Sequence, residues 1–436
     1  LDLKAVGTSY QIKEIQYAKK VALQGCNEMR KKEIVSSCPR EIKIENIERS
    51  KNFKMSLTIF KDKKTTNISA SNIEKVEPLD LLQKAKDMVL SLPEDIYSGL
   101  PDKDNYPSKI PNLDLEDTNV VSEKSLLNKA LTAEETMLKN KNITNTEGSN
   151  LSTALVENKT YSSNGFIASY KKTFNSISAV AIAGKDTNMQ RDYEYASSIY
   201  YNDLPDPEYI GRKAAERAFS RLNSKKIKSC NLDVIFEPRI AKSIISSFAN
   251  CSTGSAIARG TSFLIGQEGK KIFKDEVNIL NQPHQKRGIG STPYDFNGVK
   301  NNDLFIVNDG KLENYFLTTR SARQLKLQPN GNSAPHNLTL QSGKTSPQEL
   351  ISNIKKGFYV TEMLGMSFNP INGDYSRGAA GFLIENGELT YPVSEVTIAG
   401  NMSDMIKNLT PANDLKLEDN INAPTILIEN MTLAGQ

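Results

Sequence analysis

Four consecutive residues have side chains that could take part in catalysis or binding: Asp374, Tyr375, Ser376 and Arg377. A serine beside an acid is a candidate nucleophile, but it needs a neighbouring base, which is most often histidine. Turn-forming residues surround the four, and short acidic side chains in turns commonly accept backbone N–H bonds. We therefore expect Asp374 to stabilise a turn and Arg377 to make an ion pair or an interface contact. The four residues are candidates for substrate or partner contacts.

The chain contains only two histidines, His284 and His336, and both lie in proline-containing loop sequence. Neither has an acid or a thiol beside it in a recognisable catalytic or metal-binding motif. We predict that both are loop residues without a ligand role. Their distance from Ser376 in the fold stays open, so a self-standing hydrolase that uses serine or a loop histidine remains an alternative.

The four cysteines, Cys26, Cys38, Cys230 and Cys251, are widely separated and form no CxxC pair. Without an export signal, scattered cysteines are predicted to be free thiols. Cys251 follows a predicted helix, whose C-terminal end carries the negative pole and does not favour a thiolate. We expect it to be a small buried residue.

Composition places the 436-residue chain among globular proteins of two or three domains, with 38% hydrophobic and 24% charged residues. Its net charge of +4 is spread along the sequence, so nothing calls for nucleic acid as a partner. No apolar run approaches the roughly 18 residues of a membrane span, and the start lacks a signal-peptide core. We expect a cytoplasmic protein.

The elements that must position these residues indicate an α+β protein. In residues 1–92 we predict an N-terminal α/β sandwich-like domain. Its predicted order is a helix, three strands of a small sheet and a second helix, over residues 12–29, 40–50, 55–60, 65–70 and 79–92. Four prolines among polar residues then predict an irregular connector over 93–115.

A mixed middle domain is predicted over residues 116–225. Ser122 is a suitable N-cap for a helix that runs to about residue 140, and Asp206 with Pro207 begins another. Between these helices we predict strands at 143–145, 151–159, 165–173, 176–184 and 192–201.

The C-terminal domain, residues 226–436, is predicted to be rich in antiparallel strands and to form a barrel or a sandwich. It begins with a strand at 232–236 and a helix at 238–250, and Ser346 caps a later helix that we extend to 356. Asn386-Gly387 between two alternating runs predicts a hairpin, because a type I′ turn needs φ > 0 at both central residues. A similar hairpin is predicted at 304–312.

Residues 365–401 form a family signature and contain the sequence NPINGDYSRGAAGFLIENGELTYPVSEVTIAGN. This stretch resembles the TldD/PmbA family and is similar in particular to its PmbA (TldE) branch. Shorter pieces around 286–291, 321–323 and 357–362 also resemble the family. The resemblance covers the last domain by sequence and the first two by their order of elements.

The resemblance implies where a metal site would lie. In the TldD branch a helix carries H-E-x-x-x-H, and a cysteine near the C-terminus completes a zinc site, with the Glu acting on bound water. The matching helix here is 238–250, where Ser246, Ser247 and Cys251 take the places of the first His, the Glu and the second His. Beyond Cys251 there is no further cysteine. We expect no catalytic metal on this chain.

The resemblance also implies a function. PmbA-type chains pair with a TldD-type catalytic subunit, and the heterodimer degrades or processes peptides or unfolded polypeptides in a shared chamber. Zinc is then expected on the partner chain, and this chain is expected to hold extended substrate by strand addition. A homodimer of the isolated chain, and a binding or regulatory role such as modulation of DNA gyrase, stay open as alternatives.

Overall fold

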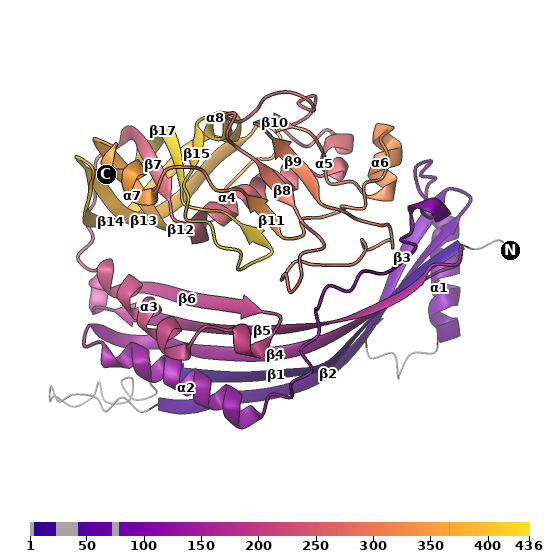
Figure 1. The fold of residues 1–436 in the computed structure, drawn as a ribbon, viewed down its shortest axis with the longest axis horizontal. Helices are drawn as coiled ribbons and strands as arrows, with labels where there is room; N and C mark the ends of the chain where they lie inside the picture. Colours follow the sequence, from indigo (N-terminus) through magenta and orange to yellow (C-terminus); the bar gives the residue numbers. More distant parts are fainter. Residues whose placement is uncertain (1–3, 23–41, 72–77, 366) are drawn as a thin grey trace.

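The computed structural model describes residues 4–22, 42–71, 78–365 and 367–436. Six antiparallel strands form one long sheet in the order β3-β2-β1-β4-β5-β6. Four of these strands are 17 to 20 residues long, and the sheet curves beneath the C-terminal half of the chain (Figure 1). The strand bounds are β1 Lys4–Ala22, β2 Ile42–Lys61, β3 Lys64–Ser71, β4 Ile143–Ser162, β5 Ile167–Ala183 and β6 Gln190–Ser198.

The first predicted helix is wrong over the part that the structure describes, because residues 12–22 belong to β1. The pairing of β1 with β2 shifts register between Ile12 and Ile15, which marks a β-bulge. A bulge separates two apolar residues by three positions, and this spacing is also that of neighbouring residues on a helix face. Residues 23–29 of that predicted helix lie outside the described residues.

The predicted small N-terminal sheet is also wrong. β2 unites two predicted strands, and β1 pairs with β4, so the first strands continue the sheet of the middle region. The predicted strand pairs within 143–159 and within 165–184 are likewise single strands, β4 and β5. Residues 93–115 are irregular, as predicted, apart from a short 3₁₀ turn at Lys103–Asn105. The domain boundaries themselves stay a prediction.

Three helices cover the sheet. α1 (Pro78–Ser91) packs on β2 and β3, while α2 (Glu123–Lys139) and α3 (Pro207–Ser220) share a core with β4 and β5. Ser122 caps α2 by accepting from the backbone of Ser125, as predicted. At Gly211 of α3 an added Cβ would lie 2.2 Å from the carbonyl oxygen of Ala133. This glycine therefore permits the close packing of the two helices.

The C-terminal region contains a closed barrel of five strands, which decides between the predicted barrel and sandwich. Its strands are β7 (Cys230–Phe236), β12 (Lys356–Leu364), β13 (Asp374–Glu385), β14 (Glu388–Asn401) and β17 (Ile426–Ala434). Pairing of β14 with β17 closes the ring, and β15 (Leu409–Pro411) extends it from β17. The predicted hairpin between β13 and β14 is confirmed, with φ of 51° at Asn386 and 83° at Gly387.

A second sheet and five helices complete this region. The sheet has the order β10-β9-β8-β11-β16. Its strands are β8 Ile279–Asn281, β9 Leu304–Asn308, β10 Lys311–Leu312, β11 Leu338–Leu340 and β16 Ile421–Asn422. The helices are α4 Pro238–Cys251, α5 Gly254–Arg259, α6 Thr319–Leu325, α7 Pro347–Ser352 and α8 Met402–Lys407. Two more 3₁₀ turns lie in the middle region, Asp186–Asn188 and Tyr201–Asp203. Within the described residues, no helix has the length and apolar character that crossing a membrane requires.

Candidate functional site

Helix α4, which follows barrel strand β7, presents two different faces. Its apolar face packs into the core of the barrel region, where Ile244, Ile245 and Phe248 are at most 1% exposed. The other face carries serines that are partly exposed, including Ser246 and Ser247. The Ser247 hydroxyl donates to the carbonyl of Ser243, one turn earlier, at 3.0 Å. This is the usual back-bonding of a helical serine, and it needs no external partner.

Cys251, the last residue of α4, lies in the core and is 0% exposed. Burial raises the pKa of its thiol to about 11, although the Ser262 side chain acts in the opposite direction. The thiol is therefore protonated at neutral pH, and a thiol must lose its proton to act as a metal ligand or a nucleophile.

The residues at the predicted metal positions do not fit a zinc ion. Zinc sites use imidazole, thiolate and carboxylate donors. Ser246 and Ser247 offer only hydroxyl groups, and Cys251 offers a buried, protonated thiol. Across the described part of the chain, no three His, Cys, Asp or Glu side chains are grouped closely enough to hold a metal ion.

The four residues singled out in the sequence lie at the start of barrel strand β13. Asp374 organises the preceding turn: its carboxylate accepts from the amide of Asn372 at 2.6 Å and from that of Asn401 at 3.3 Å. Tyr375 points inward and is 3% exposed, and burial raises the pKa of its hydroxyl to about 12. Ser376 is exposed.

Arg377 connects β13 to its surroundings. Its Nε donates to the carbonyl of Gly365 at 2.8 Å, and Nη1 lies 3.5 Å from the hydroxyl of Ser243 on α4. The structure thus brings the serine face of α4 together with residues 374–377 at the start of β13, which we call the signature segment. No spacing pattern could predict this contact, because the two residues are 134 positions apart in the sequence.

The two histidines make their contacts in another part of the region. His284 Nε2 lies 2.7 Å from the amide oxygen of Asn301, and His336 Nδ1 lies 2.9 Å from the carbonyl of Gly290. Burial lowers the pKa of His336 to about 4, so its ring is neutral at pH 7. Neither contact involves Ser376.

A cavity of about 530 Å³ separates the long sheet from loops of the C-terminal region. We call it the sheet pocket. It is lined by three residues of β4 (Val156, Asn158, Thr160), three of β5 (Tyr170, Lys172, Phe174), and loop residues Ile289, Gly290, Ser291, Thr292, Tyr294, Asp295, Phe296, Ser333, Ala334, Pro335, His336 and Asn420. This site was not predicted from the sequence. One signal was present, since adjacent residues of a strand point to opposite faces and Lys171-Lys172 must therefore send one lysine inward.

Asp295 is a buried carboxyl group in the sheet pocket. Its Oδ1 accepts from the backbone N–H groups of Asn297 and Val299, both at 2.8 Å, whereas Oδ2 is buried and has no hydrogen-bond partner. The Ser333 hydroxyl lies near enough to favour the charged form, but not in hydrogen-bond geometry to Oδ2. Burial outweighs these groups and raises the pKa of Asp295 to about 7.

The raised pKa of Asp295 predicts that this residue lowers the free energy of unfolding by an amount that depends on pH. Between about pH 4 and 7 the folded protein holds a proton that the unfolded chain releases, so stability falls as the pH rises. Asp295→Asn keeps an oxygen for Asn297 and Val299 but does not titrate. Relative to wild type, the variant should gain about 1.4 kcal/mol in free energy of unfolding per pH unit across this window. Urea unfolding of both proteins at several pH values measures the difference in their free energies of unfolding. His336 titrates in both proteins, so its contribution largely cancels from that difference. A pH-independent difference would contradict the assignment.

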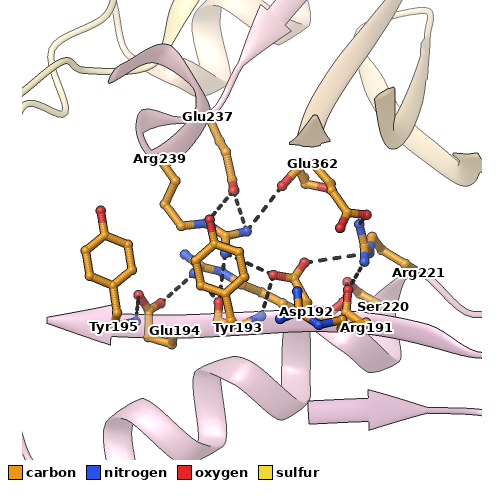
Figure 2. Close-up of polar contacts among 12 residues, drawn as sticks. Arg191, Asp192, Tyr193, Glu194, Tyr195, Ser220, Arg221, Glu237, Arg239 and Glu362 are labelled. Atoms are coloured by element: carbon orange, nitrogen blue, oxygen red, sulfur yellow. Dashed lines mark hydrogen bonds and ion pairs between the residues drawn. The ribbon is translucent and has the colours of Figure 1, made fainter. Parts of the chain in front are cut away.

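Buried charges join the long sheet to the barrel region (Figure 2). Arg239, at the start of α4, contacts Asp192 of β6 at 2.9 Å and Glu237 at 2.6 Å. Arg221, just after α3, pairs with Asp192 at 3.6 Å and with Glu362 of β12. We call these five side chains the junction network. Burial raises the pKa of Glu237, whereas the neighbouring arginines favour its charged form.

Comparisons with known proteins agree with this architecture. Residues 116–222 match the PmbA/TldA metallopeptidase central domain, and residues 229–435 match the C-terminal domain of the same family. Metalloprotease PmbA of Escherichia coli O157:H7 is 33% identical over 92% of this chain and 90% of its own. The PmbA homolog of Haemophilus influenzae is 32% identical over 90% of this chain and 88% of its own.

Solved structures share the whole fold. A Bacteroides thetaiotaomicron protein described as a candidate modulator of DNA gyrase superposes with a TM-score of 0.87 at 26% identity, over 100% of this chain and 95% of that one. TldE of Thermococcus kodakarensis superposes with a TM-score of 0.81 at 19% identity, over 100% and 97% of the two chains. At this lower identity the likeness concerns the fold.

The fold and the matched domains define the class: the chain belongs to the PmbA/TldD metallopeptidase family. Within the family, its similarity to the PmbA proteins over nine tenths of its length, together with the TldE fold, places it in the PmbA (TldE) branch.

Proposed function

We propose that this chain is a subunit of a cytosolic zinc metalloprotease and carries no catalytic metal site of its own. It pairs with a TldD-type catalytic chain, which supplies the zinc, and together they degrade or process peptides or unfolded polypeptides. The observation that carries the proposal is the donor set of α4, where two hydroxyl groups and a buried protonated thiol stand at the metal positions that the family resemblance implies. The names of the PmbA relatives and of the TldE neighbour support the metalloprotease family to which the proposal assigns the chain.

The signature segment is the proposed contact with partner or substrate. Asp374 and Ser376 are exposed on one face of β13, whereas the buried Tyr375 and the partly exposed Arg377 lie on the other face. Exposed apolar side chains adjoin it, since Leu364 is 57% and Ile371 58% exposed. Arginine and apolar side chains together are typical of protein interfaces.

Pairing tests this proposal directly. The purified chain is mixed with the TldD-type chain encoded in the same genome, and the masses of the species are measured by analytical ultracentrifugation. We expect a one-to-one complex, which replaces any homodimer formed by the isolated chain. If the two chains sediment separately at micromolar concentration, the proposed subunit role is wrong.

Arg377→Ala is predicted to weaken pairing more than folding. The substitution removes the bond to Gly365 and the approach to Ser243, at a cost of about 1 kcal/mol to stability. An interface arginine contributes more, so affinity for the partner should fall by roughly tenfold or more. Arg212→Ala, at an exposed pair with Glu216 on α3, is the matched control and should change neither quantity appreciably. A variant at Arg377 that unfolds, or that pairs like wild type, removes the reason for placing the interface here.

A regulatory function is the second candidate, because the Bacteroides relative is described as a candidate modulator of DNA gyrase. Binding of gyrase by the isolated chain, with no requirement for a TldD-type partner, would favour it.

A further inference from the structure

The sheet pocket contains a buried cation for which no acidic partner is present. Lys172 of β5 is 7% exposed, and its ammonium group donates to the carbonyls of Ile289 at 2.6 Å and Ser291 at 2.9 Å. An ammonium has three N–H groups, so these two bonds leave one of them unassigned. Among the ion pairs of the described residues, none joins Lys172 to a carboxylate. Buried lysines are normally paired, which makes this one unusual.

Its neighbour Lys171 shows the contrast. The Lys171 side chain is 38% exposed and pairs with Glu116 at 3.0 Å. The two lysines share a strand and differ only in the face to which they point. The inward lysine thus adds to the pocket a positive charge that no carboxylate of the described residues neutralises, although its Nζ also lies 4.9 Å from the centre of the Phe174 ring. Burial lowers its pKa to about 8.

Around this charge the pocket is apolar and aromatic. Tyr170 and Tyr294 meet edge to face with ring centroids 5.6 Å apart, and Phe296 is 56% exposed at the wall. The volume of about 530 Å³ lies within the range of small-ligand sites, which combine apolar walls with a few fixed polar groups. Asp295 also lines the pocket, with its Oδ2 buried in the wall.

We propose that the sheet pocket binds the C-terminal carboxylate of a peptide, with Lys172 as the counter-charge and the aromatic walls enclosing an apolar terminal side chain. The carboxylate of the ligand pairs with the Lys172 ammonium, and the charge-assisted hydrogen bond between them supplies affinity that a neutral amide cannot. The carboxylate site rests on the geometry, whereas the choice of a peptide as its carrier rests on the proposed function.

Isothermal titration of the isolated full-length chain at pH 7 tests the proposal without the partner, so its outcome is independent of pairing. Three peptides are compared: acetyl-Ala-Ala-Phe as the free acid, the same peptide as its amide, and acetyl-Ala-Glu-Phe amide. We expect the free acid to bind at least about tenfold more tightly than either amide. Equal binding of acid and amide, or no binding of the acid, overturns the proposal. Equal binding of the glutamate peptide overturns the assignment to a chain terminus.

A pair of variants then assigns the charge. Lys172→Met should reduce the acid-to-amide affinity ratio to about one, whereas Lys171→Met should leave the ratio unchanged. Thermal unfolding of both variants shows whether the loop carbonyls of Ile289 and Ser291 tolerate the loss of their donor. If Lys172→Met is folded and keeps the preference for the acid, Lys172 only holds the loop on the sheet and the proposal fails.

Discussion

Peptidase activity is expected only when this chain and a TldD-type chain are combined. Among the described residues, no group of His, Cys, Asp and Glu side chains could hold a metal ion that activates water. On the proposed function, hydrolysis of a denatured protein substrate by the isolated chain should therefore equal the buffer rate. Addition of the partner should produce hydrolysis that a zinc chelator abolishes and added zinc restores. Gel electrophoresis of a casein digest measures both.

The control for this experiment is the complex made with Arg377→Ala at concentrations where pairing is incomplete. Its activity should fall in proportion to the fraction of complex formed. Chelator-insensitive hydrolysis by the lone chain would instead favour the self-standing hydrolase, and Ser376→Ala would then show whether that serine takes part.

Arg239→Ala is expected to cause a large loss of stability. It would leave Glu237 and Asp192 buried without their closest cation, since their side chains are 11% and 3% exposed. Removing one partner of a buried pair costs about 3–5 kcal/mol. Urea unfolding measured by circular dichroism should show this loss.

Arg212→Ala is again the matched control, because its pair with Glu216 is about half exposed and contributes at most about 0.5 kcal/mol. If the two variants lose similar stability, the junction network does not hold the sheet and the barrel region together. A variant of Arg239 that is stable but no longer pairs with the partner would contradict the purely structural role assigned to the network.

The elements that could be predicted from the sequence are those that depend on neighbouring residues. The turn at Asn386-Gly387 was predictable because both residues adopt positive φ. The start of α2 was predictable because the Ser122 hydroxyl accepts a backbone N–H. Elements fixed by distant partners were not predictable in this way. β1 was mistaken for a helix because its bulge gives apolar residues helical spacing.

The strand lengths were underestimated for a related reason. Gly148 and Ser149 are turn-forming residue types, yet they lie inside β4, where Gly148 has φ of 91° at a register shift. Ser149 donates to the carbonyl of Ala130 on α2, and Asn175 of β5 donates to that of Ile199. Tertiary contacts thus satisfy polar side chains that, in isolation, indicate a loop.

The same distinction between neighbouring and distant residues applies to the candidate site. The signature segment was identified from its own residues, since its turn and its strand are local. The sheet pocket joins Lys172, Asp295 and His336, which are more than 100 residues apart at the widest, so no spacing pattern could reveal it. Only the packing of the C-terminal loops on β4 and β5 brings them together.

The zinc content of the isolated chain tests the central claim most directly. The chain is purified without chelator, dialysed against micromolar zinc and then against metal-free buffer, and analysed by plasma mass spectrometry. The proposed function predicts far less than one zinc ion per chain, with stoichiometric zinc appearing only in the complex with the partner. One tightly held zinc ion per isolated chain, retained by wild type and lost from a Cys251→Ala variant that remains folded, would contradict the account.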